Sequence, residues 1–514
     1  MPAGVPLGRS VSAPVRPLGF GTLAGLAGVL LVGAALLLPR LGSQSLWLDE
    51  GLTVGPAVDA TSVRDLIART RAVDTQPPAS HFLLWVLGAW MPRTEFFFRL
   101  PSFLAVELGI AMLYVLVRRL WGPPVALLVA GCAQLSPYLC FYAAEARNYG
   151  PWFLMITLSY LAVVRWWEAV RGDDSRAAWR WALALGAVNA LGLWTHLFHV
   201  FVVIAEAAIL GAWIAFPIAT LRERWSTLAS LAAAHVLTAV LFAPWLLVLV
   251  GSAASGTAGV PWTRPFTLGN FGYYLFAAHF GVSLGPDLRS LHALPMSAVL
   301  AAHPLALALA AIAMGITALT HARLVLDAWC APERRWELIP LVAWPLVSLA
   351  GPLAYGVARS FPLHPRHLLF AWPLLPIVLA LGVTRYPRLR PFIFASLALQ
   401  VLALGNLLYD GHYAKDDERG AVHFAEAHSG AVAYVLGDVA PLYARRAEGH
   451  EKTFGAFRAD TDDVWLIDNS AWEAQNQRAR RRLALAMRAM HMRYDGGTTR
   501  FRGIVLRHWT ARRS

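Results

Sequence analysis

Charge is scarce in this sequence. Only 15% of its 514 residues are Asp, Glu, Lys or Arg, whereas 57% are hydrophobic. Soluble domains carry about 25% charged residues, so this composition excludes an ordinary soluble enzyme and favours a polytopic membrane protein. Lysine is almost absent, with Lys415 and Lys452 as its only two occurrences, and arginine carries nearly all of the positive charge. This bias is typical of a GC-rich bacterial genome.

Cysteine is rare as well, and no internal repeat is visible. Cys132, Cys140 and Cys330 have no spacing that predicts a disulfide framework or a zinc site. The net charge of +13 resides largely in the short loops between apolar runs, and no basic face with interleaved aromatic residues stands apart from them. We therefore exclude nucleic acid as a partner.

Apolar runs long enough to cross a bilayer, about 17–25 residues each, recur along most of the chain. We predict an α-helical polytopic membrane protein with about eleven transmembrane helices. The expected spans are 18–39, 98–117, 123–142, 151–170, 178–195, 197–217, 227–250, 297–319, 337–357, 367–383 and 391–408.

Arginine is concentrated in alternate loops, and the positive-inside rule places those loops in the cytoplasm. The N-terminus is then inside, and the loop after the first span is outside. The first span lacks a small-x-small cleavage site, so we expect a retained anchor. We expect a multi-pass protein of a bacterial plasma membrane. The arginines that set this orientation are Arg9, Arg16, Arg118, Arg119, Arg165, Arg171, Arg176, Arg180, Arg222, Arg224, Arg323, Arg334, Arg335, Arg385, Arg388 and Arg390.

The chain divides into a cytoplasmic tail (1–17), a membrane domain (18–408) and a small soluble α/β domain (409–514) on the extracytoplasmic side. Two long outer loops, 40–97 and 252–296, interrupt the membrane domain; the second has the composition of a lid or substrate-facing loop. Within these parts we expect an amphipathic stretch at 63–69, an interfacial helix at 81–90, strands at 431–436, 464–467 and 503–506, and helices at 419–428 and 475–492.

Polar groups gather on the outer face under this topology. Carboxylates and arginines beside the bilayer surface suit an anionic, membrane-tethered substrate, because the planar guanidinium pairs bidentately with phosphate. The outer loops contribute Asp49, Glu50, Asp74, Glu145, Arg147, Tyr149, His196, His199, Arg359, Arg366 and His367. The i, i+3 spacing of His196 and His199 suits either metal ligation or aromatic packing. For Glu107 and Glu206, inside predicted spans, we favour contacts within the helix bundle over a proton path.

Several motifs, in this order, resemble the GT-C glycosyltransferases, and more narrowly the bacterial branch akin to protein O-mannosyltransferases and aminoarabinose transferases. The resemblance covers most of the chain. The motifs are Trp47-x-Asp49-Glu50, Asp74-x-x-Pro77-Pro78, Phe98-Arg99-Leu100-Pro101-Ser102, Glu145-Ala146-Arg147-x-Tyr149, Thr195-His196-Leu197-Phe198, His364-Pro365-Arg366-His367 and Lys415-Asp416-Asp417-Glu418-Arg419-Gly420.

The resemblance implies a sugar donor carried on polyprenyl phosphate and transfer with inversion to a lipid, glycan or protein acceptor. Asp49 would be the general base, and Glu50 and Glu145 would orient the acceptor or hold a divalent cation. Arg147 and Arg366 would stabilise the phosphate. Asp74, Tyr149, His196 and His367 complete the expected substrate site. Gln76 stands where many relatives have histidine, which weakens the case for a metal ligand there.

Two other functions compete with this interpretation. A secondary transporter or flippase for a lipid phosphate or a polysaccharide should carry ionisable groups at mid-membrane on broken helices, often in two related halves. Here the acids cluster at one face and no repeat is visible, which favours the enzyme. A scaffold or degenerate transferase is the third possibility, and the intact Asp49 argues against it.

Overall fold

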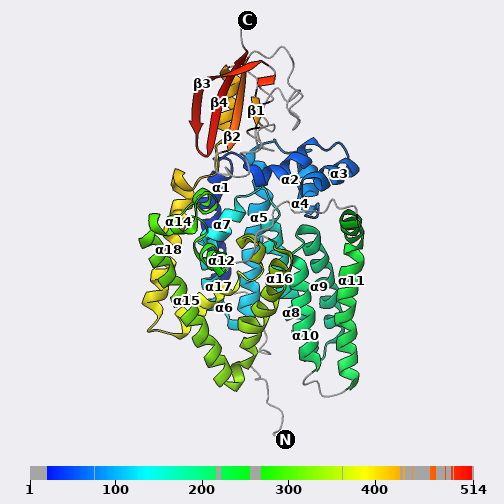
Figure 1. Ribbon diagram of the computed structural model, residues 1–514. Coiled ribbons are helices and arrows are strands. Elements are labelled where there is room, and N and C mark those ends of the chain that lie inside the picture. Colours follow the sequence, from blue (N-terminus) through cyan, green and yellow to red (C-terminus); the bar gives the residue numbers. More distant parts are fainter. Residues whose placement is uncertain are drawn as a thin grey trace.

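The structure is a computed structural model of the chain (Figure 1). It describes residues 20–74, 76–215, 221–254, 268–361, 363–428, 432–434, 463–469 and 491–511, and the single residues 443, 481, 485, 488 and 489. A tall bundle of helices forms the body, three short helices lie on one end of it, and a small sheet stands above them at the C-terminal end. This architecture confirms the predicted fold class.

In the described part of the chain, each predicted span corresponds to one or more helices. The helices are α1 (Phe20–Leu41), α5 (Glu95–Trp121), α6 (Pro123–Gln134), α7 (Pro137–Ala143), α8 (Tyr149–Arg171), α9 (Ser175–Thr195), α10 (His199–Ala215), α11 (Leu221–Ala254), α15 (Pro304–Cys330), α16 (Trp344–Arg359, preceded by η2 Pro332–Glu337 and η3 Ile339–Ala343), α17 (Leu374–Arg385) and α18 (Arg390–Tyr409). Among the described residues, seven helical stretches are long and apolar enough to cross a membrane, or eight with a bent pair counted as one. The count of eleven therefore stays a prediction.

The bent pair is α6 and α7, whose axes differ by 64°. The first helix ends at Gln134, and Ser136 caps the second, because its hydroxyl accepts a hydrogen bond from the Leu139 amide at 3.3 Å. Pro137 follows at the first helical position, where its missing N–H costs nothing. The break turns α7 and its aromatic side chains toward the candidate site.

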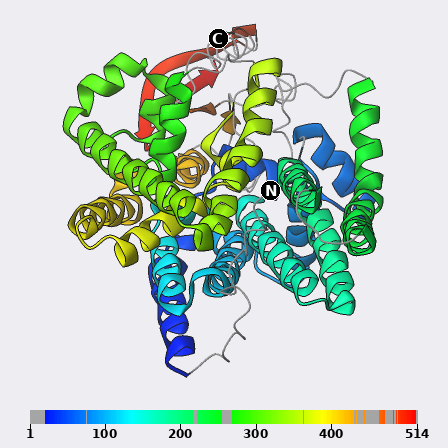
Figure 2. The same cartoon turned by 90° about the horizontal axis from the view of Figure 1, so that it is seen from below.

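Seen from below, the helices surround a common core, and α1, in blue, stands at the edge of the body (Figure 2). Only 11% of the apolar window of α1 is buried, which agrees with a lipid-facing helix. By contrast, 56% of the corresponding window of α5 is buried, so α5 forms the centre of the membrane body.

The first outer loop is largely helical. It consists of α2 (Leu48–Asp59), α3 (Val63–Val73) and α4 (Ala79–Leu87). The amphipathic stretch and the interfacial helix predicted from the sequence correspond to α3 and α4, whereas α2 was not predicted. Ser62 caps α3 by accepting from the Asp65 amide at 3.2 Å. These helices lie across the upper end of the bundle (Figure 1).

The second outer segment is not the loop that its Gly, Pro and aromatic content indicated. Its described part holds α12 (Leu268–Phe280), α13 (Leu288–Ala293) and the start of α14 (Met296–Ala302). Burial of aromatic residues explains the difference: Tyr274, Phe276 and Phe280 are each at most 6% exposed, so α12 is part of the body. It does face the candidate site, through Tyr273 and Ala277.

The C-terminal domain contains η5 (Gly411–Tyr413), α19 (Glu418–His428) and a sheet in the order β1-β2-β4-β3. β1 (Val432–Tyr434), β2 (Asp463–Asn469) and β4 (Ile504–Ala511) confirm the predicted strands. β3 (Met492–Phe501) was not predicted; it contains Gly496 and Gly497, a residue type depleted in strands, and a register shift between Tyr494 and Thr498 accommodates them. Most of the predicted helix 475–492 lies outside the described residues.

Candidate active site

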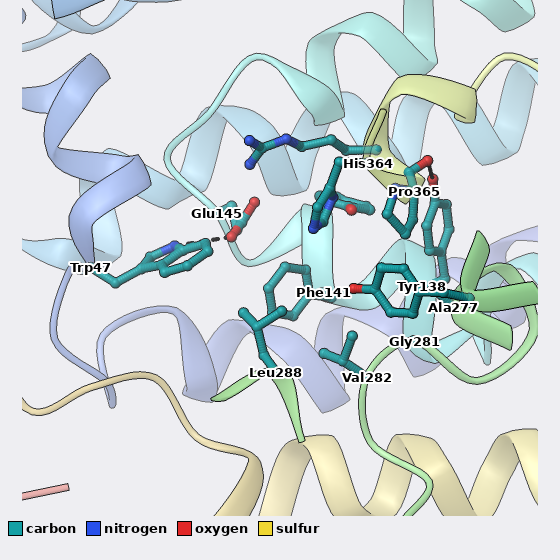
Figure 3. A pocket seen from close by; sticks show the side chains of 13 residues that line it. Trp47, Tyr138, Phe141, Glu145, Ala277, Gly281, Val282, Leu288, His364 and Pro365 are labelled. Carbon is teal, nitrogen blue, oxygen red and sulfur yellow. Dashed lines mark hydrogen bonds between the residues drawn. The ribbon is translucent and has the colours of Figure 1, made fainter. Parts of the chain in front are cut away.

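A pocket lies where α2, α7, α12 and the short helix η4 (Pro365–Leu368) meet (Figure 3). Its empty volume, open solvent included, is about 400 Å³. The lining is mostly aromatic and apolar, with Glu145 and Arg366 as its charged members. Its residues are Trp47, Tyr138, Phe141, Tyr142, Glu145, Tyr273, Ala277, Gly281, Val282, Leu288, His364, Pro365 and Arg366. A few polar groups in an apolar concavity are typical of a binding site.

Asp49 lies in the first turn of α2 and forms an ion pair with Arg366 of the pocket wall. One carboxylate oxygen accepts a hydrogen bond from Arg366 Nη1. The side chain of Asp49 is 20% exposed and that of Arg366 is 25% exposed, so this pair is reachable from solvent. The carboxylate predicted as general base therefore lies at the pocket and beside a cation.

Glu50 lies away from the pocket and is completely buried. Its two carboxylate oxygens accept bidentate hydrogen bonds from Arg99, at 2.7 Å each. Lys415 Nζ lies 3.2 Å from the same carboxylate, and the Ala146 amide donates to it at 2.8 Å. Despite burial, which opposes ionisation, Arg99 and Lys415 lower the pKa of Glu50 to about 2. These contacts make Glu50 an anchor, and its burial argues against the predicted direct contact with an acceptor.

Glu145 lies in the pocket wall and is 1% exposed. Trp47 Nε1 donates to its carboxylate at 3.0 Å, as the dashed line in Figure 3 marks. Burial raises the pKa of Glu145 to about 7; the nearby Lys415 opposes the rise, while the charges of Glu50 and Asp49 add to it. The group can therefore gain or lose a proton near neutral pH.

Arg147 is directed away from the pocket wall. Its Nη1 donates to Asp74 Oδ2 at 2.9 Å and to Thr53 Oγ1 at 2.8 Å, and the residue is only 6% exposed. Burial opposes the charge, but the attraction of Asp74 raises the pKa of Arg147 above its ordinary value. The structure therefore brings Asp74 and Arg147 together as a buried ion pair that ties the first outer loop to the link between α7 and α8.

The ring of Tyr149 lies near both arginines. The guanidinium carbon of Arg147 lies 5.8 Å from the ring centroid of Tyr149, and that of Arg366 lies 5.6 Å from it. A ring face attracts a cation at such distances, with an energy of about 0.5–2 kcal/mol. Tyr149 thus helps to hold two like charges within one site.

His196 and His367 lie in an aromatic cluster behind the site. His196 is fully buried and stacks on Trp152 at 4.0 Å, and His367 stacks on Phe198 at 4.7 Å. The two histidine rings are 6.2 Å apart. His199 is hydrogen bonded to Trp152 at 3.2 Å, so this arrangement favours the packing interpretation of the two histidines in the fifth-to-sixth turn over a metal site.

The carboxylates of the site are paired with basic side chains in the described part of the chain. Within the ranges that the structure describes, no group of three or more His, Cys, Asp or Glu side chains could hold a metal ion. Each of Asp49, Glu50 and Asp74 is instead matched by a basic side chain. The expected cation stays an untested prediction, and no step below depends on one.

Arg99 and Lys415 are two contributors that the sequence did not assign to the site. Besides Glu50, Arg99 donates to three backbone carbonyls at 2.7–2.8 Å and is 1% exposed. Lys415, from the link to the C-terminal domain, donates to the Ala144 carbonyl at 3.0 Å. Both residues belong to motifs that carry the family resemblance, and Lys415 is one of only two lysines. These two features of the sequence could have indicated that they belong to the site.

Buried donors at the pocket include the Nε of Arg366 and the hydroxyl of Tyr273, which have no hydrogen-bond partner in the described part of the chain. A buried donor without a partner is costly, by about 1–3 kcal/mol. Such donors are satisfied when a ligand with acceptor oxygens enters.

Comparison with known proteins gives three kinds of match. The sequence model of the family described as dolichyl-phosphate-mannose-protein mannosyltransferase matches residues 75–247. Two curated relatives, both undecaprenyl phosphate-alpha-4-amino-4-deoxy-L-arabinose arabinosyl transferases from Pseudomonas aeruginosa (strains UCBPP-PA14 and PAO1), are each 28% identical over 178 residues. That match covers 34% of this chain and 30% of either relative, so it spans about a third of their length.

The fold is similar to that of solved ArnT structures from Cupriavidus metallidurans. The form bound to undecaprenyl phosphate gives a TM-score of 0.55 at 14% identity, and the apo form gives 0.51 at 15% identity. Each match covers 95% of this chain and 98% of the other. The predicted resemblance to GT-C glycosyltransferases, and to aminoarabinose transferases among them, is confirmed.

Proposed function

We propose that this chain, with its ArnT-like fold and its outer-face pocket, is a membrane glycosyltransferase. It would move a sugar from a polyprenyl-phosphate donor to an acceptor hydroxyl. The observation that carries the proposal is the Asp49–Arg366 ion pair at the pocket wall. The proposed base and the arginine that would bind the phosphate then lie side by side, as a transfer from a lipid phosphate requires. The relatives from Pseudomonas aeruginosa, whose name states an undecaprenyl-phosphate-linked donor, support this substrate class.

The donor phosphate would bind Arg366 and Tyr273. Both residues line the pocket, and the Nε of Arg366 and the hydroxyl of Tyr273 are donors without a partner among the described residues. A phosphate that accepts from Arg366 competes with Asp49 for the same guanidinium, since phosphate and carboxylate are both charge-assisted partners of arginine. Donor binding would therefore release Asp49 from its ion pair. The base becomes available only when the donor is present.

The chemical step would be a single displacement at the anomeric carbon. The acceptor oxygen forms a bond to that carbon as the bond to the phosphate oxygen breaks, and the anomeric configuration inverts. The hydroxyl proton passes to Asp49, and polyprenyl phosphate leaves with its negative charge held by Arg366. Because the leaving group is good, the protein contributes mainly position and charge stabilisation.

Glu145 would assist from the pocket wall. Since the pKa of its carboxyl is raised to about 7, a large fraction carries a proton at neutral pH and can donate a hydrogen bond. Trp47 fixes one of its oxygens from the opposite side at 3.0 Å. A carboxyl that both accepts and donates suits the orientation of a sugar or acceptor hydroxyl.

The acceptor would be a lipid. A second pocket of about 500 Å³ shares Trp47 and Phe141 with the first, and a third of about 460 Å³ shares Phe141 and Lys415 with the second. The third pocket is lined by Leu37 of α1 and Leu407 of α18, at the ends of two membrane helices. Such an opening suits a membrane-anchored molecule better than a soluble one.

The site would face the extracytoplasmic side of a bacterial plasma membrane, as the arginine-rich loops indicate. A transporter is the second candidate, and it would use ionisable groups within the spans. In the described part of the chain, the ion pairs around Asp49, Glu50 and Asp74 instead cluster at one end of the bundle. That clustering favours the enzyme.

The decisive experiment is donor turnover. Purified protein is incubated with a panel of radiolabelled polyprenyl-phosphate sugars, and release of the sugar, by transfer or by hydrolysis, is measured beside Asp49→Asn. We expect turnover of at least one donor by the wild type and its loss in the variant. Equal turnover in both would remove Asp49 as the base, and no turnover of any donor would overturn the proposed function.

A further inference from the structure

A buried carboxyl group lies inside the membrane body, apart from the pocket. Glu206 is located two turns into α10 and has no exposed surface. One oxygen is hydrogen bonded to Ser159 Oγ of α8, and the other accepts from Asn189 Nδ2 of α9 at 2.5 Å. None of the ion pairs in the described part of the chain involves Glu206, although an uncompensated charge at such depth costs about 3 kcal/mol or more.

A chain of hydrogen bonds connects this group to Trp152. The indole Nε1 of Trp152 donates to His199 Nδ1 at 3.2 Å. An indole only donates, so Nδ1 is the acceptor and the proton of neutral His199 is on Nε2. That Nε2 donates to Asn189 Oδ1 at 3.1 Å, which fixes the amide with its NH₂ group toward Glu206.

Counting protons along the chain assigns the state of Glu206. Ser159 has one hydroxyl proton but contacts two oxygens, Asn189 Oδ1 at 2.9 Å and Glu206 Oε1. If Glu206 is protonated, its hydroxyl donates to Ser159, Ser159 donates to Asn189, and every contact holds one proton. An ionised Glu206 would leave the Ser159 and Asn189 oxygens facing each other without a proton between them. The neutral acid alone satisfies all the contacts.

The other end of the chain reaches the candidate site. Trp152 stacks on His196 with the rings 4.0 Å apart and 11° from parallel. His196 Nδ1 accepts from the Phe198 amide at 3.1 Å, so its proton is on Nε2. That Nε2 is buried and has no partner among the described residues, and the ring lies 5.9 Å from Tyr149.

We propose that neutral Glu206 is a positioning residue: through Asn189, His199 and Trp152 it holds the His196 ring against Tyr149, which lies beside the Arg366 guanidinium that would bind the donor phosphate. The inference rests on the proposed function for its last link. Gly192 supports it independently, because a Cβ there would lie 2.4 Å from His199 Nε2. The helix thus leaves room for the His199 ring where the network needs it.

Infrared spectroscopy tests the state of Glu206 without any substrate. A protonated carboxylic acid has its own carbonyl stretch, separate from that of a carboxylate. We expect this band in the difference spectrum between wild type and Glu206→Gln at neutral pH, and not in the difference spectrum between wild type and Asp59→Asn, which alters an exposed carboxylate. An unchanged spectrum in Glu206→Gln would mean an ionised Glu206 and would overturn the proposal.

Donor kinetics test the positioning. Gln keeps one donor and one acceptor, so Glu206→Gln should retain kcat and KM within about twofold, while Glu206→Ala and Gly192→Ala should raise the donor KM about five- to tenfold, as for one lost hydrogen bond. Gly211→Ala, in α10 with no atom near the added Cβ, is the matched control. An unchanged KM at lowered melting temperature in both Ala variants would reduce the network to a structural role and overturn the positioning.

The two measurements separate this proposal from the proposed function. If the wild type turns over no donor, the function fails and the last link of the network fails with it. The infrared band still decides the protonation of Glu206 in that case. If donors are turned over but Glu206→Gln behaves like Glu206→Ala, the function stands and the neutral network is overturned.

Discussion

Asp49 and Arg366 are 317 residues apart in the sequence, yet their side chains form an ion pair at the pocket. The pair explains how one small site can hold both the proposed base and the arginine that would bind the donor phosphate. An adjacent guanidinium stabilises the ionised carboxylate that a base needs, and it leaves the carboxylate when a phosphate competes for it. Substitutions at Asp49, at the two arginines and at Glu145 test these roles.

Asp49→Asn keeps the shape of the side chain and removes its capacity to accept a proton. Transfer should fall by about 10²–10⁴-fold, the range for loss of a general base, at an unchanged melting temperature. Initial rates with a labelled donor measure the loss. Asp59→Asn, at the exposed end of the same helix, is the control and should behave as wild type. Near-normal transfer by Asp49→Asn would move the base to Glu145.

Lysine substitutions separate the two arginines. Arg366→Lys keeps the charge but loses the planar fork, so the donor KM should rise about tenfold while the melting temperature stays close to wild type. Arg147→Lys should instead lower the melting temperature, because Arg147 binds Asp74 and Thr53 in a buried contact. The opposite result, with a raised donor KM only in Arg147→Lys, would identify Arg147 as the residue that binds the donor phosphate.

Glu145 should make stability depend on pH. Its pKa is raised by burial from 4.5 to about 7, so the folded protein holds a proton that the unfolded chain has lost between these values. Stability contributed by this proton is present below pH 4.5 and is lost as the pH rises toward 7. Across that window the melting temperature of the wild type should fall relative to that of Glu145→Gln. Parallel curves for the two proteins would contradict the raised pKa.

The helical elements of the first outer loop are tied to the membrane body by buried ion pairs. Glu50 connects α2 to α5 through Arg99, and Arg147 connects the link before α8 to the residue that ends α3, Asp74. A buried pair is costly to break because the remaining charge stays without compensation. The carboxylate motif of the loop therefore serves two purposes, with Asp49 at the pocket and Glu50 in the protein interior.

Glu50→Gln tests this division. Removing one partner of a buried pair costs about 3–5 kcal/mol, so the variant should lose stability in a thermal melt before any specific effect on transfer appears. Asp65→Asn, which alters an exposed contact with Arg69 on α3, is the control and should leave the melting temperature near wild type. A stable Glu50→Gln protein with lost transfer would instead place Glu50 in direct contact with the acceptor.

The whole molecule is layered along the long axis of the helix bundle. The bundle, the outer helices α2 to α4 and the C-terminal sheet follow one another from the N-terminal end to the C-terminal end (Figure 1). Lys415 contacts all three layers. It lies in the link to the C-terminal domain, and its Nζ lies 3.2 Å from Glu50 of α2 and 3.0 Å from the carbonyl of Ala144, which follows α7 of the bundle. The orientation of these layers decides which side of the membrane holds the site.

Cysteine labelling tests that orientation. In a background with Cys132, Cys140 and Cys330 replaced by serine, single cysteines at Ser43 and Ser360 should react with an impermeant reagent in intact cells. One at Ala331 should react only after lysis, and it serves as the internal control. Labelling of Ser43 only after lysis would place the carboxylates in the cytoplasm and contradict an outer-face site.

The sequence alone determined the class of the molecule, because hydropathy and arginine placement follow from composition and local order. Apolar runs predicted the helices, and short motifs predicted the resemblance that the comparisons confirm. Only the tertiary structure decided what each charged residue contacts. Asp49 and Glu50 are neighbours in the chain, but consecutive residues of a helix lie on different faces, so α2 directs Asp49 to the Arg366 pair and Glu50 to the interior. Likewise Arg147 and Arg366 look equivalent in the sequence, and long-range packing alone places Arg366 at the pocket and Arg147 beside Asp74.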